Sequence, residues 1–226
     1  MKFITSISPK RIKRQRYCIN SWIKHGNVVA IQAEHEIQEL QPQFPQVQFI
    51  ACSQIEEDSS RVNICAMIKQ GPGLLINSDI KIESTQEEFN IDWEPKPKQF
   101  NVGVRYDFDG PGEPKTLNKY GIDAFLITEE IINAIEDHGF VIGIPVWDYW
   151  IIWHMITKGF KIKTKRSPGL LHLNHPMGWP MSDMPKGMEI MKRDYGIGQK
   201  TLNLVIGDIT DRLNVITNSR NTPYEA

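Results

Sequence analysis

The sequence predicts an α/β fold built on a largely parallel sheet. Short apolar strands alternate with helical segments through the first 80 residues, and such alternation implies right-handed crossovers between parallel strands. A Gly-Pro-Gly turn at residues 71–73 opens an apolar run without polar alternation, which is typical of a strand buried on both faces. That strand, which ends near Asp79, is the element around which we expect the rest of the chain to be organised.

Composition narrows the classes of protein to consider. The chain has 226 residues, enough for one large domain or two small ones, and its 40% hydrophobic and 23% charged content is ordinary for a globular protein. A net charge of −1 argues against a nucleic-acid partner. Three cysteines without metal-ligand spacing indicate a reduced, cytoplasmic chain. The apolar segment at the N-terminus is too short for a signal peptide, and no apolar run is long enough to predict a membrane span.

The first half is predicted to form four β-α units. Strands are expected at residues 2–7, 27–32 and 47–52 and within the organising stretch 71–80, and helices at 10–25, 36–43 and 61–70. The carboxyl ends of parallel strands share one edge of a sheet, where open α/β folds bind ligands. The residues expected to line that crevice are Ser6, Ser8, Gln32, Ser53 and Asp79. No glycine-rich dinucleotide fingerprint or Walker motif follows these strands, so neither a dinucleotide cofactor nor P-loop chemistry is expected.

Two charged patterns in this half indicate an ionic ligand. Asp79, with Asn77 two residues before it, suits a hard divalent cation that bridges a diphosphate. The alternative is a polar turn that caps the strand, and Asp107 and Asp109 form a rival Asp-x-Asp. Basic side chains also crowd the first turns of the helix at 10–25, where cations are disfavoured by the helix dipole. These side chains are Lys10, Arg11, Lys13, Arg14 and Arg16. Their presence there predicts either that this face of the helix is solvated or that an anion lies nearby.

In the second half, strands are expected at 101–106, 121–127 and 160–164, and helices at 128–139, 146–157, 186–195 and 203–216. Residues 83–99 are predicted to be a surface loop, with a short strand near 89–93, and residues 219–226 a frayed end. Asp123 lies within an apolar run, so it must face the crevice or have a dedicated partner. Asp148 lies in the first turn of an almost wholly apolar helix, beside Trp147. The helix dipole predicts a lowered pKa there, which favours hydrogen bonding to a sugar hydroxyl over strong proton abstraction.

A His-x-x-His pair follows the last predicted strand, at His172 and His175. Alternation along an extended chain places His172 and Asn174 on the same side, so at most one imidazole need reach a given ion. An imidazole that returns to Asp79 would supply an open ligand set with room for a diphosphate.

Five segments in order now resemble a known family. They read Ile-Asn-Ser-Asp-Ile, Val-Gly-Val-Arg-Tyr-Asp, Gly-Ile-Asp-Ala-Phe, Pro-Val-Trp-Asp-Tyr-Trp and His-Leu-Asn-His. Small bacterial glycosyltransferases of GT-A type carry Asn-Ser-Asp-Ile, Gly-x-Arg-Trp-Asp, Gly-x-Asp-x-Phe, Trp-Asp-Asn-Trp and His-Gln-Asn-His in the same order. The resemblance implies a Rossmann-like, mixed but mainly parallel sheet flanked by helices. It divides a catalytic domain at 1–178 into a nucleotide-sugar half (1–82) and an acceptor half (83–178), followed by a helical extension (179–226) that wraps the core.

The resemblance also implies a function, a metal-dependent transfer of sugar from a UDP- or GDP-sugar to a glycan or other hydroxyl acceptor. Mn²⁺ or Mg²⁺ would be held by Asp79 with His172 or His175. The donor would contact Asn77, Arg105 and Asp107 in addition to the crevice residues. The acceptor and catalytic side would have Asp123, Trp147 and Asp148. The chain departs from the family pattern at Asn77, which replaces an acid, at Tyr149, and at Pro176-Met177.

Two alternative functions remain open at this point. One is a GT-A-like protein that binds a nucleotide sugar or glycan without turnover, which the incomplete Asp-x-Asp suggests. The other is a nucleotidyltransferase, which would need a glycine-rich basic loop after the first strand. Residues 8–11 read Ser-Pro-Lys-Arg and lack the glycines.

Overall fold

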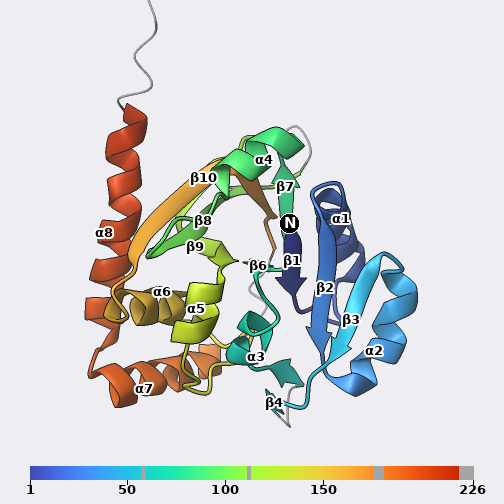
Figure 1. Ribbon diagram of the computed structural model, residues 1–226, viewed down its shortest axis with the longest axis horizontal. Helices are drawn as coiled ribbons and strands as arrows, with labels where there is room; N and C mark the ends of the chain where they lie inside the picture. The colour runs from blue at the N-terminus through green and yellow to red at the C-terminus, as the bar shows by residue number, and fades with distance from the viewer. Residues whose placement is uncertain (57–59, 111–112, 176–180, 219–226) are drawn as a thin grey trace, which may run out of the picture.

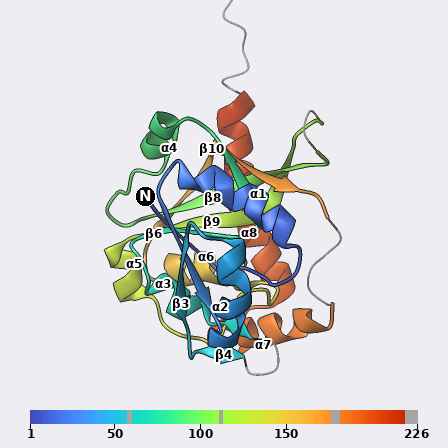
Figure 2. The ribbon, with the colours of Figure 1, turned by 90° about the vertical axis from the view of Figure 1, so that its right-hand side faces the viewer.

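A computed structural model describes residues 1–56, 60–110, 113–175 and 181–218 and confirms the α/β prediction. A twisted eight-stranded sheet lies between two layers of helices (Figures 1 and 2). The strand order is β3-β2-β1-β6-β9-β8-β10-β7. The strands are β1 (Lys2–Thr5), β2 (Asn27–Gln32), β3 (Val47–Ala51), β6 (Gly73–Ile76), β7 (Ile80–Glu83), β8 (Gln99–Phe108), β9 (Thr116–Ile127) and β10 (Lys161–Leu173).

The sheet is mixed, and its parallel part comes from the first half of the chain. The strands β3, β2, β1 and β6 pair in parallel, as the β-α alternation predicts. The strand β9 runs antiparallel to both β6 and β8, and β10 runs parallel to β8 but antiparallel to β7. The carboxyl ends of β1, β2, β3 and β6 therefore lie at one edge of the sheet.

Each face of the sheet has its own hydrophobic core. One face is covered by α1 (Ile12–Ile23), α2 (Glu34–Leu40) with a 3₁₀ turn η1 (Gln41–Gln43), and α4 (Gln86–Asp92). The other face is covered by α3 (Ile64–Ile68), α5 (Glu129–Ala134), α6 (Trp147–Thr157), α7 (Met184–Tyr195) and α8 (Gln199–Asn218). A turn η2 (Met181–Asp183) precedes α7, and β4 (Ile55–Glu56) with β5 (Arg61–Val62) forms a small hairpin.

The apolar helix α6 lies in the middle of the second core. Its residues Trp150, Ile151, Ile152 and Met155 have no exposed surface, which explains why its sequence lacks a polar stripe. Among the described residues, no helix combines the length and apolar character needed to cross a bilayer.

Two element predictions are wrong. The segment expected to be a helix over residues 61–70 begins as β5, and its helical part is only α3. The loop expected over 83–99 follows β7, which ends at Glu83, and contains α4, with no strand near 89–93. Sequence reasoning missed the capping box that starts α4, in which Thr85 and Glu88 each accept a hydrogen bond from the other's backbone N–H. Residues 176–177 and 219–226 lie outside the described chain.

Replacing Thr85 with alanine should therefore lower the free energy of unfolding by about 1 kcal/mol, since one N-terminal donor of α4 loses its acceptor. The helix contributes Phe89 and Trp93, both fully buried, so its loss would be felt in the core. Urea unfolding of Thr85→Ala tests this, and Thr85→Ser is the control because it keeps the hydroxyl. Equal stability of the two variants would contradict the capping role.

Candidate functional site

The loops after β1 and β2 are held together by glutamine side chains. Gln32 accepts hydrogen bonds from the Ser6 hydroxyl at 2.7 Å and the Ile7 N–H at 2.6 Å, and donates to the Ile7 carbonyl at 2.9 Å. Gln15 on α1 accepts from the Ser8 N–H at 2.8 Å and from the Ser78 hydroxyl at 2.7 Å. These residues thus fix the strand-end edge, while Ser53 is exposed after β3.

The pairing of β10 brings a histidine to the same edge. This strand lies between β7 and β8, and His172 is in register with Ile80 on one side and Asp107 on the other. The His172 Nδ1 lies 3.1 Å from Asp107 Oδ1, and its Nε2 lies 3.5 Å from Asp79 Oδ2. The imidazole therefore lies between two carboxylates from separate strands.

The second histidine joins the same group. After β10 ends, the chain turns so that His175 Nε2 lies 3.1 Å from Asp79 Oδ2 and 3.2 Å from His172 Nε2. Both imidazoles thus reach Asp79, contrary to the expectation that strand alternation leaves one apart, because the alternation ends with the strand. Asn174, expected beside His172, instead donates to Asp109 at 2.9 Å.

The three residues that could hold a cation here are Asp79, His172 and His175, whose ligand atoms lie within 4.8 Å of one another. Burial raises the pKa of Asp79, but hydrogen bonds from the two histidines outweigh it and hold the pKa well below its usual range. The carboxylate is therefore negatively charged at neutral pH and able to bind a cation.

Asn77, which stands in place of the first acid of an Asp-x-Asp motif, contacts Asp123 and not the two histidines. Asn77 donates its side-chain N–H to Asp123 Oδ1 at 2.6 Å, and Arg105 donates to Asp123 Oδ2 at 3.0 Å. Arg105 also donates to Asp107 at 2.9 Å. Because Asp107 contacts His172, Arg105 links Asp123 to the group formed by Asp79, His172 and His175. Asp123 thus has the dedicated partners that its place in an apolar run requires.

Removing the arginine should destabilise the fold. The side chains of Arg105 and Asp123 are 21% and 7% exposed, so Arg105→Met leaves a buried carboxylate without its cation. We expect the free energy of unfolding to fall by roughly 3 kcal/mol. Arg193→Met is the control, because Arg193 is 63% exposed in its pair with Asp194 and should cost less than about 1 kcal/mol. Denaturant unfolding measures both, and equal losses would contradict the buried pair.

Asp148 lies at the N-terminus of α6, half-buried, with its carboxylate accepting the Tyr149 N–H at 3.0 Å. The predicted lowering of its pKa is wrong. Burial, and then the nearby Asp123 carboxylate, raise the pKa of Asp148 to about 7. Trp147 is 6% exposed and packs against Phe125 with ring centres 5.3 Å apart, so it anchors this end of α6 in the core.

Two arginines at the start of α1 belong to the same region. Arg11 Nη1 lies 2.7 Å from His175 Nδ1. The Nε and Nη1 atoms of Arg14 are buried and have no hydrogen-bond partner among the described residues. A buried guanidinium N–H without an acceptor is costly, so an anion near Arg14 would stabilise it. The run of basic residues at the start of α1 was the signal for these side chains, but it does not distinguish them from their solvated neighbours.

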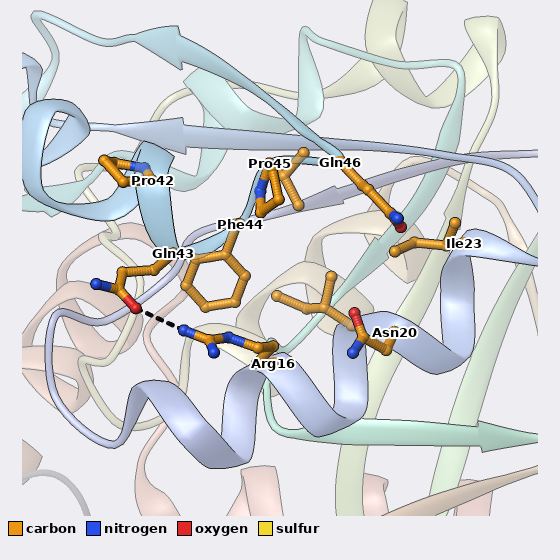
Figure 3. Close-up of a pocket in the computed structure, with 10 residues that line it drawn as sticks. Arg16, Asn20, Ile23, Pro42, Gln43, Phe44, Pro45 and Gln46 are labelled. Atoms are coloured by element: carbon orange, nitrogen blue, oxygen red, sulfur yellow. Dashed lines mark hydrogen bonds between the residues drawn. The ribbon is translucent and has the colours of Figure 1, made fainter.

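Two hollows lie away from Asp79, His172 and His175. One, of about 400 Å³, separates α1 from the turn at residues 42–47 and is lined by Arg16, Asn20 and Phe44 among others (Figure 3). A second, of about 310 Å³, lies beside Asn63 and Asp137. Neither is lined by a predicted site residue.

Comparison with known proteins finds fold likeness at low sequence identity. No protein-family model matches the chain, and no curated protein matches it. A solved 4-diphosphocytidyl-2C-methyl-D-erythritol synthase is similar over 77% of this chain and 92% of its own, at 9% identity and a TM-score of 0.41. The enzyme of that description from Anaerococcus prevotii is similar over 85% and 95%, at 8% identity and a TM-score of 0.44. Similarity at this level assigns neither a reaction nor a ligand to this chain.

Proposed function

We propose that the chain is a metal-dependent glycosyltransferase that moves a sugar from a nucleotide-diphosphate sugar to a hydroxyl acceptor. The observation that carries the proposal is the meeting of Asp79, His172 and His175 at the carboxyl edge of the sheet. Open α/β sheets bind ligands at this edge. The arginines at the start of α1 lie on the same side, as a diphosphate would require.

Asp79, His172 and His175 would hold the cation, and we propose Mn²⁺ over Mg²⁺ because two imidazoles suit it better than an ion that prefers oxygen ligands. When bound, the ion would neutralise the charge that develops on the departing nucleoside diphosphate. Arg14 would donate its free N–H groups to the diphosphate, and Arg11 would add positive charge beside His175.

Two acids would act on the sugar and its acceptor. A carboxylate with a pKa of about 7 is suited to accept a proton near neutral pH, so Asp148 would deprotonate the acceptor hydroxyl. Asp123, held by Arg105 and Asn77, would position a sugar hydroxyl beside it. The nucleoside would lie along Ser6, Ser8, Gln32 and Ser53. Asp107 would lie at the edge of the sugar pocket, and Trp147 would hold Asp148 in place by packing in the core.

A screen of nucleotide sugars by thermal shift, with and without Mn²⁺, tests the proposal, since a ligand bound to the native state raises the melting temperature. We expect one UDP- or GDP-sugar to stabilise the chain only with Mn²⁺, and to release nucleoside diphosphate when an acceptor is present. Stabilisation without release would indicate a binding protein. Release of pyrophosphate from a nucleoside triphosphate would indicate a nucleotidyltransferase instead.

A further inference from the structure

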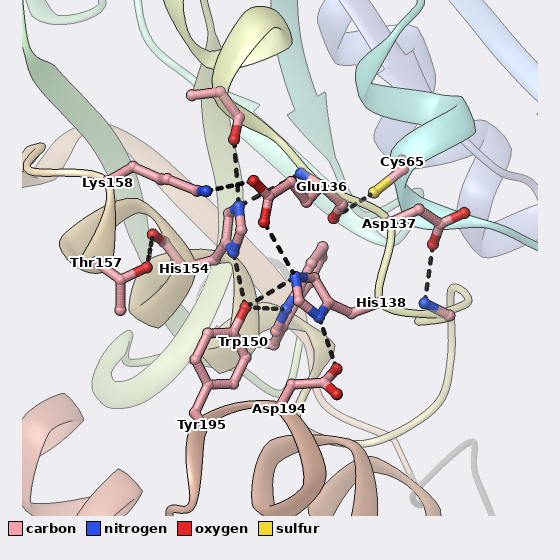
Figure 4. Close-up of polar contacts among 12 residues, drawn as sticks. Cys65, Glu136, Asp137, His138, Trp150, His154, Thr157, Lys158, Asp194 and Tyr195 are labelled. Atoms are coloured by element: carbon pink, nitrogen blue, oxygen red, sulfur yellow. Dashed lines mark hydrogen bonds and ion pairs between the residues drawn. The ribbon is translucent and has the colours of Figure 1, made fainter.

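A second group of ligand-type side chains lies on the helical face opposite α1, where three segments meet (Figure 4). Glu136 and His138 follow the end of α5, His154 lies on α6, and Tyr195 ends α7. Glu136, His138 and His154 each offer one ligand atom, and these atoms lie within 4.8 Å of one another. None of these residues belongs to the strand-end site.

The neighbours of this group orient two of its ligand atoms inward. His138 donates its Nδ1–H to Asp194 Oδ2 at 2.6 Å, which leaves Nε2 pointing to the inside of the group. Lys158 binds Glu136 through Oε1, which leaves Oε2 at 3.9 Å from His138 Nε2. In zinc sites, a carboxylate commonly accepts a hydrogen bond from the nitrogen of a ligating imidazole that does not face the metal. This hydrogen bond fixes the ring and raises its basicity.

The hydroxyl of Tyr195 adds an oxygen in the middle of the group. It lies 2.7 Å from His154 Nδ1 and 3.3 Å from His138 Nε2, and it accepts a hydrogen bond from Trp150 Nε1 at 3.2 Å. Both imidazoles therefore face one point, and the phenol oxygen lies where a fourth ligand or a water stands in a four-coordinate site.

We propose that Glu136, His138 and His154 bind a zinc ion that fastens α6 to the segment after α5, with Asp194 and Tyr195 of α7 against His138. Two imidazoles and one carboxylate are a ligand set that zinc prefers. In a tetrahedral site with zinc–ligand bonds of about 2.0–2.2 Å, ligand atoms lie about 3.3–3.6 Å apart. The Glu136–His138 separation of 3.9 Å and the remaining separations, within 4.8 Å, would have to contract when the ion binds. The role is structural, because the ion would join two segments of the helical layer.

Zinc titration of a chain without the strand-end ligands tests the site. The parent is Asp79→Ala/His175→Ala, since the strand-end group also has two histidines and an acid. After treatment with EDTA and dialysis, we expect the parent to bind one Zn²⁺ by calorimetry and to melt at a higher temperature with Zn²⁺ than without. Co²⁺ in place of zinc should give the visible absorption of a four-coordinate nitrogen and oxygen site.

Variants in the parent background identify the ligands. His138→Gln and Glu136→Gln should each weaken Zn²⁺ binding by at least tenfold, and Asp194→Asn by roughly 10–100-fold because it releases the His138 ring. Glu136→Gln should keep the fold even where His138→Gln does not, since the Glu136 side chain is 61% exposed. Glu189→Gln, an exposed acid on α7, is the matched control and should bind as the parent does.

The result that overturns the proposal is a folded parent that binds no Zn²⁺, or one that binds it equally well with Glu136→Gln and His138→Gln. Because the parent lacks two of the three strand-end ligands, Asp79 and His175, either result leaves the proposed transferase function untouched. Failure of the transferase tests would likewise leave this zinc site standing.

Discussion

Asp79→Asn is expected to reduce Mn²⁺-dependent release of nucleoside diphosphate by roughly 10³-fold, which corresponds to about 4 kcal/mol of transition-state stabilisation. Asp79 is the one carboxylate among the three residues that could hold the strand-end cation, and both histidines contact it. Its amide would bind a divalent ion weakly and would remove the negative charge that both imidazoles face. The measurement is kcat/KM for the donor at several Mn²⁺ concentrations.

The matched control is Asp109→Asn, the same change at an acid whose side chain binds Asn174 instead of the histidines. It should keep both activity and the Mn²⁺ requirement. Activity that survives Asp79→Asn but falls with Asp109→Asn would move the metal to the rival Asp-x-Asp at residues 107–109. Activity unchanged in both would remove the metal from the proposed mechanism.

Asp148→Asn is expected to lower kcat by roughly 10²–10⁴-fold with little change in KM, since it removes a general base and keeps the side-chain shape. The raised pKa of Asp148 also predicts that wild-type kcat rises as the pH passes through about 7. Glu129→Gln is the control, because Glu129 is an exposed acid in the first turn of α5. A kcat that is unchanged in Asp148→Asn would exclude it as the base.

Asp148→Asn, although it lowers activity, should raise the stability of the fold above neutral pH. The pKa of Asp148 is about 7 in the folded chain and near 3.8 unfolded, so the folded state binds its proton more tightly. The stabilisation is complete below pH 3.8 and lost as the pH rises through about 7. At pH 8 the free energy of unfolding of Asp148→Asn should therefore exceed that of the wild type by roughly 1–2 kcal/mol, a value kept small because solvent reaches part of the side chain. At pH 4 the two free energies should be nearly equal. Equal differences at both pH values would contradict the raised pKa.

The parallel half of the fold was predictable because its signals are local. Apolar runs and helix-breaking residues predict the strands β1, β2, β3 and β6, and parallel pairing then places their carboxyl ends together. The helix α4 was missed because its capping signal, Thr85 and Glu88, lies in a charged stretch that lacks apolar periodicity. The predicted direction of the Asp148 pKa shift was wrong because the helix dipole can be inferred from the sequence, whereas the burial of Asp148 and its nearness to Asp123 cannot.

The meeting of both histidines with Asp79 could not be derived from spacing alone. It depends on β10 being inserted between β7 and β8, and on the register that aligns His172 with Ile80 and Asp107. Sequence reasoning placed His172 in an extended segment after a strand at 160–164, whereas β10 continues through His172 to Leu173, and its neighbours in the sheet were not predicted. The position of His175 depends further on a turn after Leu173, which strand alternation does not describe.

The placement of β7 has a consequence for how the chain is made. This strand directly follows Asp79 in sequence, yet its partner in the sheet is β10, which ends some ninety residues later (Figure 1). During synthesis the ribosome must deliver residue 173 before the edge formed by residues 80–83 can pair. Closure over so long a separation is slow and exposes apolar surface meanwhile. Nascent chains paused before β10 should thus be the species on which chaperones act.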